Sequence, residues 1–166
     1  MRLTLQTDYA LRMLMYLALR QDRPCRVTDV ALDYGISHNH LLKVALRLGR
    51  LGYVTTLRGR TGGIALARRP EDINLGEVVR SMEDGFALTE CMRDGGRCTI
   101  SPACRLKHIA SNALEAFLAV FDSFTLADIV ENRSELAELL EISPVSEKVA
   151  RCLVRREMND RQAYIL

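Results

Sequence analysis

Long hydrophobic runs are missing from this 166-residue sequence, and their absence excludes one class of protein. Although 48% of the residues are hydrophobic, no window reaches the roughly 18 apolar residues of a membrane-spanning helix. The N-terminus also lacks the charged leader, apolar run and small-residue cleavage site of a secretory signal. We therefore expect a cytoplasmic protein with no membrane partner, formed by one compact domain and an appendage.

The sequence also lacks the even number of cysteines that a fully disulfide-paired protein would have. The sequence has five, and in a reducing cytosol cysteines are more often ligands, reactive thiols or small core residues than disulfides. Catalytic constellations are also lacking, because no motif pairs a nucleophile with a base or an acid with a base. The sequence therefore does not predict an enzyme.

The net charge of +2 conceals a strong asymmetry along the chain. Residues 1–70 contain 12 Lys/Arg and 4 Asp/Glu, a net charge of +8, whereas residues 71–166 contain 11 and 17, a net charge of −6. A basic half of this kind suits DNA binding, since the release of counterions from phosphates drives association. A solvated basic face without a partner explains the charge equally well.

Three short helices are predicted in the basic half. The first begins at a Thr4 or Thr7 cap and ends near Arg20, the second spans residues 27–34 and stops at Gly35, and the third runs from about residue 38 to 51 after a Ser37 cap. Two helices separated by a sharp glycine turn are typical of a helix-turn-helix. The apolar residues of the third helix that we expect to face inward are Leu41, Leu42, Ala45, Leu46 and Leu48.

A β-hairpin is predicted directly after these helices. Strands at residues 53–57 and 64–67 flank a loop, residues 58–63, that is rich in glycine and holds two arginines. An ordinary surface hairpin is one interpretation, but its place after a helix-turn-helix favours a wing that enters a narrow DNA groove. The residues expected to contact double-stranded DNA are Thr28, Ser37, His38, Asn39, His40, Lys43, Arg47, Arg58, Arg60 and Thr61.

The acidic half predicts a short helix over residues 75–83 and a long one from Ser101-Pro102 to about Phe124. The long helix carries an apolar seam at heptad spacing, which indicates a dimerisation helix, although packing on its own domain would need the same pattern. Ser134 is expected to cap a further helix to Leu140, and residues 145–156 could form another. The seam consists of Leu106, Ala110, Ala113, Phe117, Val120 and Phe124.

The predicted fold is thus mainly α with a small β-hairpin: a winged helix-turn-helix plus a long dimerisation helix. Residues 1–70 form the DNA-binding region, and residues 71–100 form a short helix and a cysteine loop. Residues 101–140 form the dimerisation helix and C-terminal helical pieces. The tail, residues 141–166, has no assigned role.

Three cysteines lie in or beside the loop between the short helix predicted over residues 75–83 and the long helix that follows it. Six residues separate Cys91 from Cys98 and five separate Cys98 from Cys104, which is not the spacing of a zinc ribbon. Their neighbours are Gly, Arg, Asp and Ser, so core packing is disfavoured, while the nearby arginines would stabilise thiolates. Three cysteines leave a four-ligand site incomplete, and the fourth ligand could be Asp8, His108 or a small molecule.

Several of these motifs together resemble the Rrf2 family of transcription regulators. The resemblance covers about residues 1–140. It rests on Thr7-Asp8-Tyr9-Ala10, the run Gly-Ile-Ser-His-Asn-His-Leu-Leu-Lys at residues 35–43, Arg-Gly-Arg-Thr-Gly-Gly-Ile at residues 58–64, and the cysteine loop. Asn39-His40, residues 102–107 and residues 125–128 are most similar to the nitric-oxide-sensing repressors of the family.

The resemblance implies a homodimer on a palindromic operator, with an iron–sulfur cluster held by Cys91, Cys98 and Cys104. A 4Fe–4S cluster is favoured over 2Fe–2S. In the nitric-oxide-sensing members the fourth ligand is an aspartate in the first helix, contributed by the other subunit, and Asp8 stands at the matching place. In the cluster-assembly regulators a histidine three residues after the last cysteine serves, but Lys107 stands there and His108 is one residue beyond.

The expected function is therefore a cluster-dependent DNA-binding repressor that senses nitric oxide. Residues 12–16 and 83–87 also resemble an iron-responsive member of the family, so iron or cluster status is a competing signal. A thiol-redox or zinc-dependent regulator that uses the same three cysteines is the other alternative.

Overall fold

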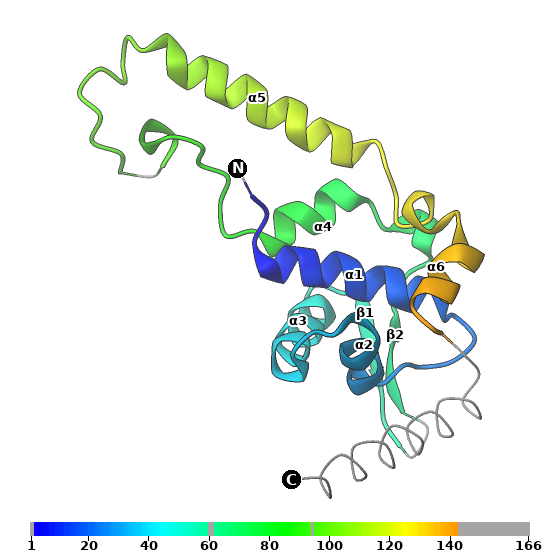
Figure 1. Ribbon diagram of the computed structural model, residues 1–166. Helices are drawn as coiled ribbons and strands as arrows, with labels where there is room; N and C mark the ends of the chain where they lie inside the picture. The colour runs from blue at the N-terminus through cyan, green and yellow to red at the C-terminus, as the bar shows by residue number, and fades with distance from the viewer. Residues whose placement is uncertain (1, 60–61, 94, 143–166) are drawn as a thin grey trace, which may run out of the picture. The chain divides into compact units, whose positions relative to one another are not determined.

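The computed structural model of the chain describes residues 2–59, 62–93 and 95–142 (Figure 1). The chain divides into two units, Met1–Glu131 and Asn132–Leu166. In the described ranges, no helix is long and apolar enough to cross a membrane.

Three helices open the first unit with nearly the predicted bounds: α1 (Leu5–Leu19), α2 (Val27–Tyr34) and α3 (His38–Arg50). The Thr4 side chain caps α1 by accepting a hydrogen bond from the Thr7 amide, which confirms one of the two predicted caps. Gly35 ends α2 in the left-handed conformation, with φ of 64°. A glycine adopts that conformation without the steric cost of a Cβ, so the turn into α3 is determined locally.

The face that α3 buries is narrower than predicted. Leu41, Val44 and Leu48 are buried, whereas Leu42 and Leu46 are 45% and 58% exposed. The prediction that these last two face inward was wrong. At 3.6 residues per turn, positions 41, 44 and 48 share one face, and this face provides the buried residues of α3, which packs on α1, α2 and β1.

The hairpin consists of β1 (Val54–Leu57) and β2 (Gly63–Leu66), paired antiparallel. Cys25, before α2, adds a bridge to the hairpin, because its amide and carbonyl both hydrogen-bond to Ile64 at 2.9 and 2.8 Å. Gly63 is required there, since a Cβ at this position would lie 2.5 Å from the Cys25 carbonyl oxygen. The hairpin is therefore attached, close to its loop end, to the segment that joins α1 to α2.

The helix α4 (Leu75–Met82) anchors the C-terminal end of the long helix α5 (Arg105–Asp122). Arg80 forms an ion pair with Asp122, and the Leu75 amide donates to the Phe124 carbonyl at 3.0 Å. The predicted start of α5 at Pro102 was wrong: residues 101–103 form turns, and Cys104 is the cap residue. Single helical turns lie at Pro70–Asp72 (η1), Glu90–Met92 (η2) and Asp128–Val130 (η3).

The second unit contributes α6 (Arg133–Leu139) to the described residues. Its cap residue is Asn132 rather than the predicted Ser134, and the side-chain Nδ2 of Asn132 donates to the Glu135 carboxylate at 2.9 Å. The predicted helix at residues 145–156 lies outside the described residues. The predicted fold class is confirmed in its elements: mainly helices, with one two-stranded hairpin among the described residues.

Truncating the buried face of α3 should cost far more stability than truncating its exposed face. Leu48 is fully buried, so Leu48→Ala should lower the free energy of unfolding by about 2–5 kcal/mol. Leu46→Ala, at a 58% exposed position on the same helix, should change it by about 0.5 kcal/mol or less. Urea unfolding of both variants measures the difference. Equal losses would contradict the observed burial of Leu48 and exposure of Leu46.

Candidate nucleic-acid interface and cysteine segment

The start of α3 presents a cluster of exposed polar side chains. Ser37, His38, Asn39, His40 and Lys43 are all exposed, at the cap and in the first two turns of the helix. Thr28, in the first turn of α2, is exposed as well. These residue types can donate to and accept from base edges and phosphates, so the structure brings together on one surface the side chains that a recognition helix needs.

One member of this cluster also contacts α1. The His40 ring stacks on the Tyr9 ring, with centroids 6.4 Å apart and planes 26° apart. The contact limits the orientations that His40 can adopt and joins the start of α3 to the first turns of α1.

Arg47 is directed away from this cluster. Its guanidinium donates to the Gln6 side chain, the Ser81 carbonyl and the Asp84 carboxylate, at 3.0, 3.0 and 3.1 Å. The role of Arg47 as a DNA contact stays a prediction, but its hydrogen-bonding groups are engaged by α1 and by the end of α4.

The hairpin supports an exposed loop with a basic residue at its start. Arg58 is exposed, and Gly59 has φ of 114°, a backbone conformation that side chains with a Cβ rarely adopt. Arg60 and Thr61 lie outside the described residues. At the base of the hairpin the Arg68 guanidinium lies 5.0 Å from the centre of the buried Tyr53 ring. Arg68 thereby adds a basic group that we did not predict from the sequence.

The three candidate ligand cysteines lie between α4 and α5. Cys91 is in η2, Cys104 is the residue before α5, and all three thiols are free and partly exposed. The Thr89 hydroxyl lies 3.1 Å from the Cys91 sulfur. Within the described ranges, no three His, Cys, Asp or Glu side chains converge as a metal site would require. The structure therefore places the three thiols on one segment without bringing them to one centre.

The two candidates for a fourth ligand have different surroundings. Asp8, in the first turn of α1, forms an ion pair with Arg12 on the next turn, with an N–O distance of 3.0 Å. His108 is exposed on α5, one turn after Cys104. Any ligation by Asp8 would have to replace or share its contact with Arg12.

Cys25 has the character of a core residue. It is 2% exposed, and burial raises the pKa of its thiol to about 11, so it stays protonated at neutral pH. The fifth cysteine, Cys152, lies outside the described residues.

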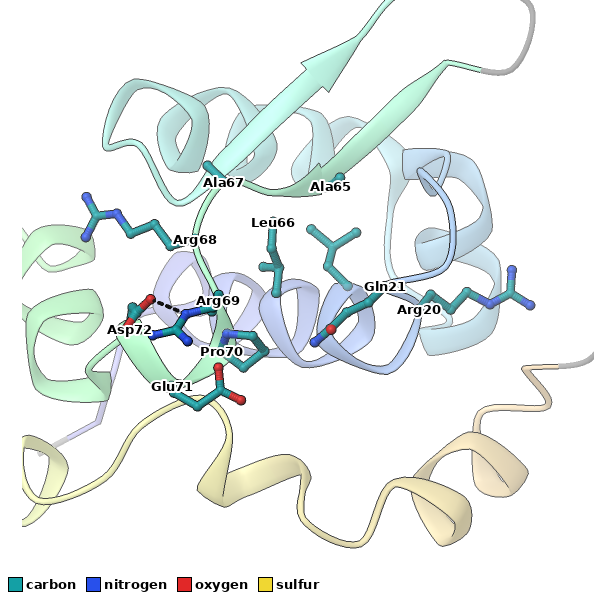
Figure 2. A pocket seen from close by; sticks show the side chains of 11 residues that line it. Arg20, Gln21, Ala65, Leu66, Ala67, Arg68, Arg69, Pro70, Glu71 and Asp72 are labelled. Carbon is teal, nitrogen blue, oxygen red and sulfur yellow. Dashed lines mark hydrogen bonds and ion pairs between the residues drawn. The ribbon is translucent and has the colours of Figure 1, made fainter.

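An open pocket lies elsewhere, between the end of α1 and the segment after β2 (Figure 2). Arg20 and Arg68 point away from it, and Arg69 is paired with Asp72 at 2.9 Å (Figure 2). Its lining contains none of the predicted site residues, and its charged groups do not converge on a ligand position.

The sequence did not reveal the role of Glu83, directly after α4. Its carboxylate accepts hydrogen bonds from the Thr4 amide and from the Thr4 and Thr7 hydroxyls. These bonds join the end of α4 to the N-terminus of α1, and we say that Glu83 closes α1. From the sequence alone, a Glu-Asp pair after a helix is expected to be solvated. Only the tertiary fold brings Glu83 into contact with Thr7, which lies 76 residues earlier in the sequence.

A helix-turn-helix followed by a wing defines the chain as a winged-helix protein, and solved structures share this fold. T. potens IscR has a TM-score of 0.66 at 24% identity, covering 82% of this chain and 90% of that one. CymR, the global cysteine regulator of B. subtilis, has a TM-score of 0.64 at 24% identity, covering 80% and 98%.

The sequence comparisons identify the family. Residues 3–132 match the Rrf2 family, which is described as an iron-dependent transcriptional regulator. The chain is 51% identical over 144 residues to the HTH-type transcriptional regulator NsrR of Bacillus subtilis (strain 168), across 86% of this chain and 99% of the relative. NsrR of Bacillus licheniformis is 49% identical over 142 residues. This chain belongs to the Rrf2 family of transcriptional regulators.

If the hairpin loop contacts DNA phosphates, Arg58→Ala should weaken binding to all duplexes. The slope of log K against log salt should become shallower by about 0.9 for each phosphate contact that is lost. Arg69→Gln is the matched control, because Arg69 is already paired with Asp72, away from the loop. Fluorescence anisotropy over a salt series measures both variants, and an unchanged slope for Arg58→Ala would argue against a DNA-binding wing.

Proposed function

We propose that the chain is an iron–sulfur-cluster-dependent repressor that binds double-stranded DNA and releases it in response to nitric oxide. The observation that carries this proposal is the combination of three free thiols on one segment with a winged-helix chain whose sequence is about half identical to that of NsrR. The segment supplies the donors for a sensor, and the fold supplies the DNA-binding surface.

Cys91, Cys98 and Cys104 would hold the cluster, with Asp8 as the fourth ligand. The donor set fits, because thiolates are the usual protein ligands of iron–sulfur clusters. Arg93, Arg97 and Arg105 follow or flank these cysteines and would stabilise the thiolate form. A bound 4Fe–4S cluster, favoured over 2Fe–2S, would supply the group that reacts with nitric oxide or is lost when iron is scarce.

DNA recognition would use two parts of the basic half. Asn39, His38 and His40, at the exposed start of α3, would meet base edges in the major groove. Arg58, with Arg60 and Thr61 in the same loop, would contact phosphates and the minor groove. Ser37, Lys43 and Thr28 would add contacts around them.

The exposed apolar face of α5 supports a homodimer. Leu106, Ile109 and Val120 of α5 are 55%, 63% and 59% exposed, and Phe124, two residues after its end, is 46% exposed, although all four lie in or beside a seam at heptad spacing. A second copy of the same helix would bury them. A dimer on a dyad axis would read a palindromic operator, and such a regulator would act in the cytoplasm.

Iron or cluster status is the second candidate signal. The family description as an iron-dependent transcriptional regulator favours it. The cysteines would bind the same group, and only the event that removes it from the protein would differ. A zinc-dependent or thiol-redox regulator would use the same thiols without a cluster.

The proposal predicts that protein purified anaerobically contains iron and sulfide, absorbs above 400 nm and binds a duplex that it selects from a randomised pool. Nitric oxide should abolish both the absorption band and DNA binding, because the ligated segment would relax. Protein treated with an iron chelator distinguishes the signals: release by chelator but not by nitric oxide would favour iron sensing. Zinc without iron, or no bound metal, would contradict the cluster.

The fourth ligand can be tested by a pair of substitutions. Asp8→Ala should make the cluster labile or shift its absorption spectrum, and should uncouple DNA binding from cluster state, because α1 would lose its link to the cluster. His108→Ala should leave both properties near normal. Anaerobic absorption spectra and DNA-binding titrations of the two variants measure this, and the opposite order would show that Asp8 is not the ligand.

A further inference from the structure

One side chain near the C-terminal end of the recognition helix α3 joins this helix to two other segments by hydrogen bonds. Arg47 is 31% exposed, and its two terminal nitrogens make three hydrogen bonds. One nitrogen donates to Gln6 on α1, and the other donates to the Ser81 carbonyl on α4 and to the Asp84 carboxylate. A single guanidinium therefore joins three segments of the first unit.

The residues that accept from Arg47 lie where α4 leads into the cysteine segment. Ser81 is in the last turn of α4, which ends at Met82, and Asp84 follows two residues later. Glu83, between them, accepts the hydrogen bonds that close the N-terminus of α1. The end of α4 thus contacts both α1, which carries Asp8, and α3, which carries the exposed polar cluster.

We propose that Arg47 is a positioning residue that couples the state of the cysteine segment to the orientation of α3, and that it is not a DNA contact. This inference rests on the proposed function, because it assumes that the cysteine segment changes with cluster state. A shift of residues 81–84 would pull on Arg47 and would tilt α3 relative to α1. The exposed start of α3, which would meet the base edges, would move with the helix.

The geometry requires arginine at this position. The planar guanidinium holds several donors in a fixed fork, so it can reach acceptors on α1 and α4 at once. A lysine ammonium concentrates its donors at one point on a flexible stem, and it keeps the charge without spanning the same acceptors. Arg47→Lys therefore distinguishes a DNA contact from a positioning residue. A phosphate contact needs mainly positive charge, whereas the hydrogen bonds from Arg47 to α1 and to the end of α4, which we call the tether, need the planar guanidinium.

The experiment measures DNA affinity of the cluster-loaded protein and of chelator-treated protein, on the duplex that the loaded wild type selects from a randomised pool. The ratio of the two affinities reports coupling, and the salt slope of the cluster-free protein reports phosphate contacts. Four variants are compared with the wild type: Arg47→Ala, Arg47→Lys, Asp84→Asn and Arg50→Ala. Arg50 is the control, because it is an exposed arginine on the same helix.

The tether predicts that Arg47→Ala and Arg47→Lys both reduce the affinity ratio by about two- to thirtyfold, with the salt slope unchanged. Asp84→Asn should reduce the ratio in the same direction but by less, because the Ser81 and Gln6 contacts remain. Arg50→Ala should leave the ratio as in the wild type. Circular dichroism and urea unfolding check that each variant is folded, and Asp84→Asn tests the tether even if the Arg47 variants do not fold.

Three outcomes would overturn the inference. If Arg47→Ala weakens both forms equally and lowers the salt slope while Arg47→Lys restores both, Arg47 is a phosphate contact. If the variants keep the wild-type ratio, the tether does not transmit cluster state, although the proposed function stands. If the wild type itself binds equally with and without the cluster, the proposed function fails and the inference fails with it.

Discussion

The burial of α1 is the constraint on which the first unit depends. Six apolar residues of this helix are almost completely buried, and α3, α4, β2 and η3 all contact α1. The hydroxyl of the buried Tyr16 is satisfied by Asp33 on α2, which accepts its hydrogen bond at 2.6 Å. Burial and the neighbouring carboxylate both raise the pKa of Tyr16, so the phenol stays protonated. The buried residues are Ala10, Met13, Leu14, Tyr16, Leu17 and Ala18.

This arrangement determines which surfaces remain for function. Because α3 buries only Leu41, Val44 and Leu48, the opposite side of the helix is open along its whole length. The Arg80 and Leu75 contacts of α4 lie at the C-terminal end of α5, and most of the apolar seam of α5 is exposed. The first surface carries polar and basic side chains beside the exposed Leu42 and Leu46, whereas the second is apolar and would be buried in the proposed homodimer.

Polar contacts at the end of α4 connect it to α1 and to α3. Glu83 closes the start of α1, and Asp84 with the Ser81 carbonyl holds Arg47 of α3. The ion pair between Arg47 and Asp84 contributes little stability, since the Asp84 side chain is 89% exposed. Its importance lies in geometry, because the segment that follows carries the three cysteines of the proposed sensor.

The sequence by itself determined the elements whose signals are local. Gly35 stops α2, Thr4 caps α1, and the glycine-rich loop separates two β-capable runs, because backbone freedom, capping and periodicity act within a few residues. The polar and basic neighbours of Cys91, Cys98 and Cys104 likewise led to the prediction of a binding segment, which stays a prediction. Only the tertiary structure decided that Leu42 and Leu46 are exposed, that Arg47 reaches α1 and α4, and that Glu83 closes α1. Those outcomes depend on how α3 and α4 pack on α1, and no local pattern specifies contacts between residues 34 to 79 positions apart.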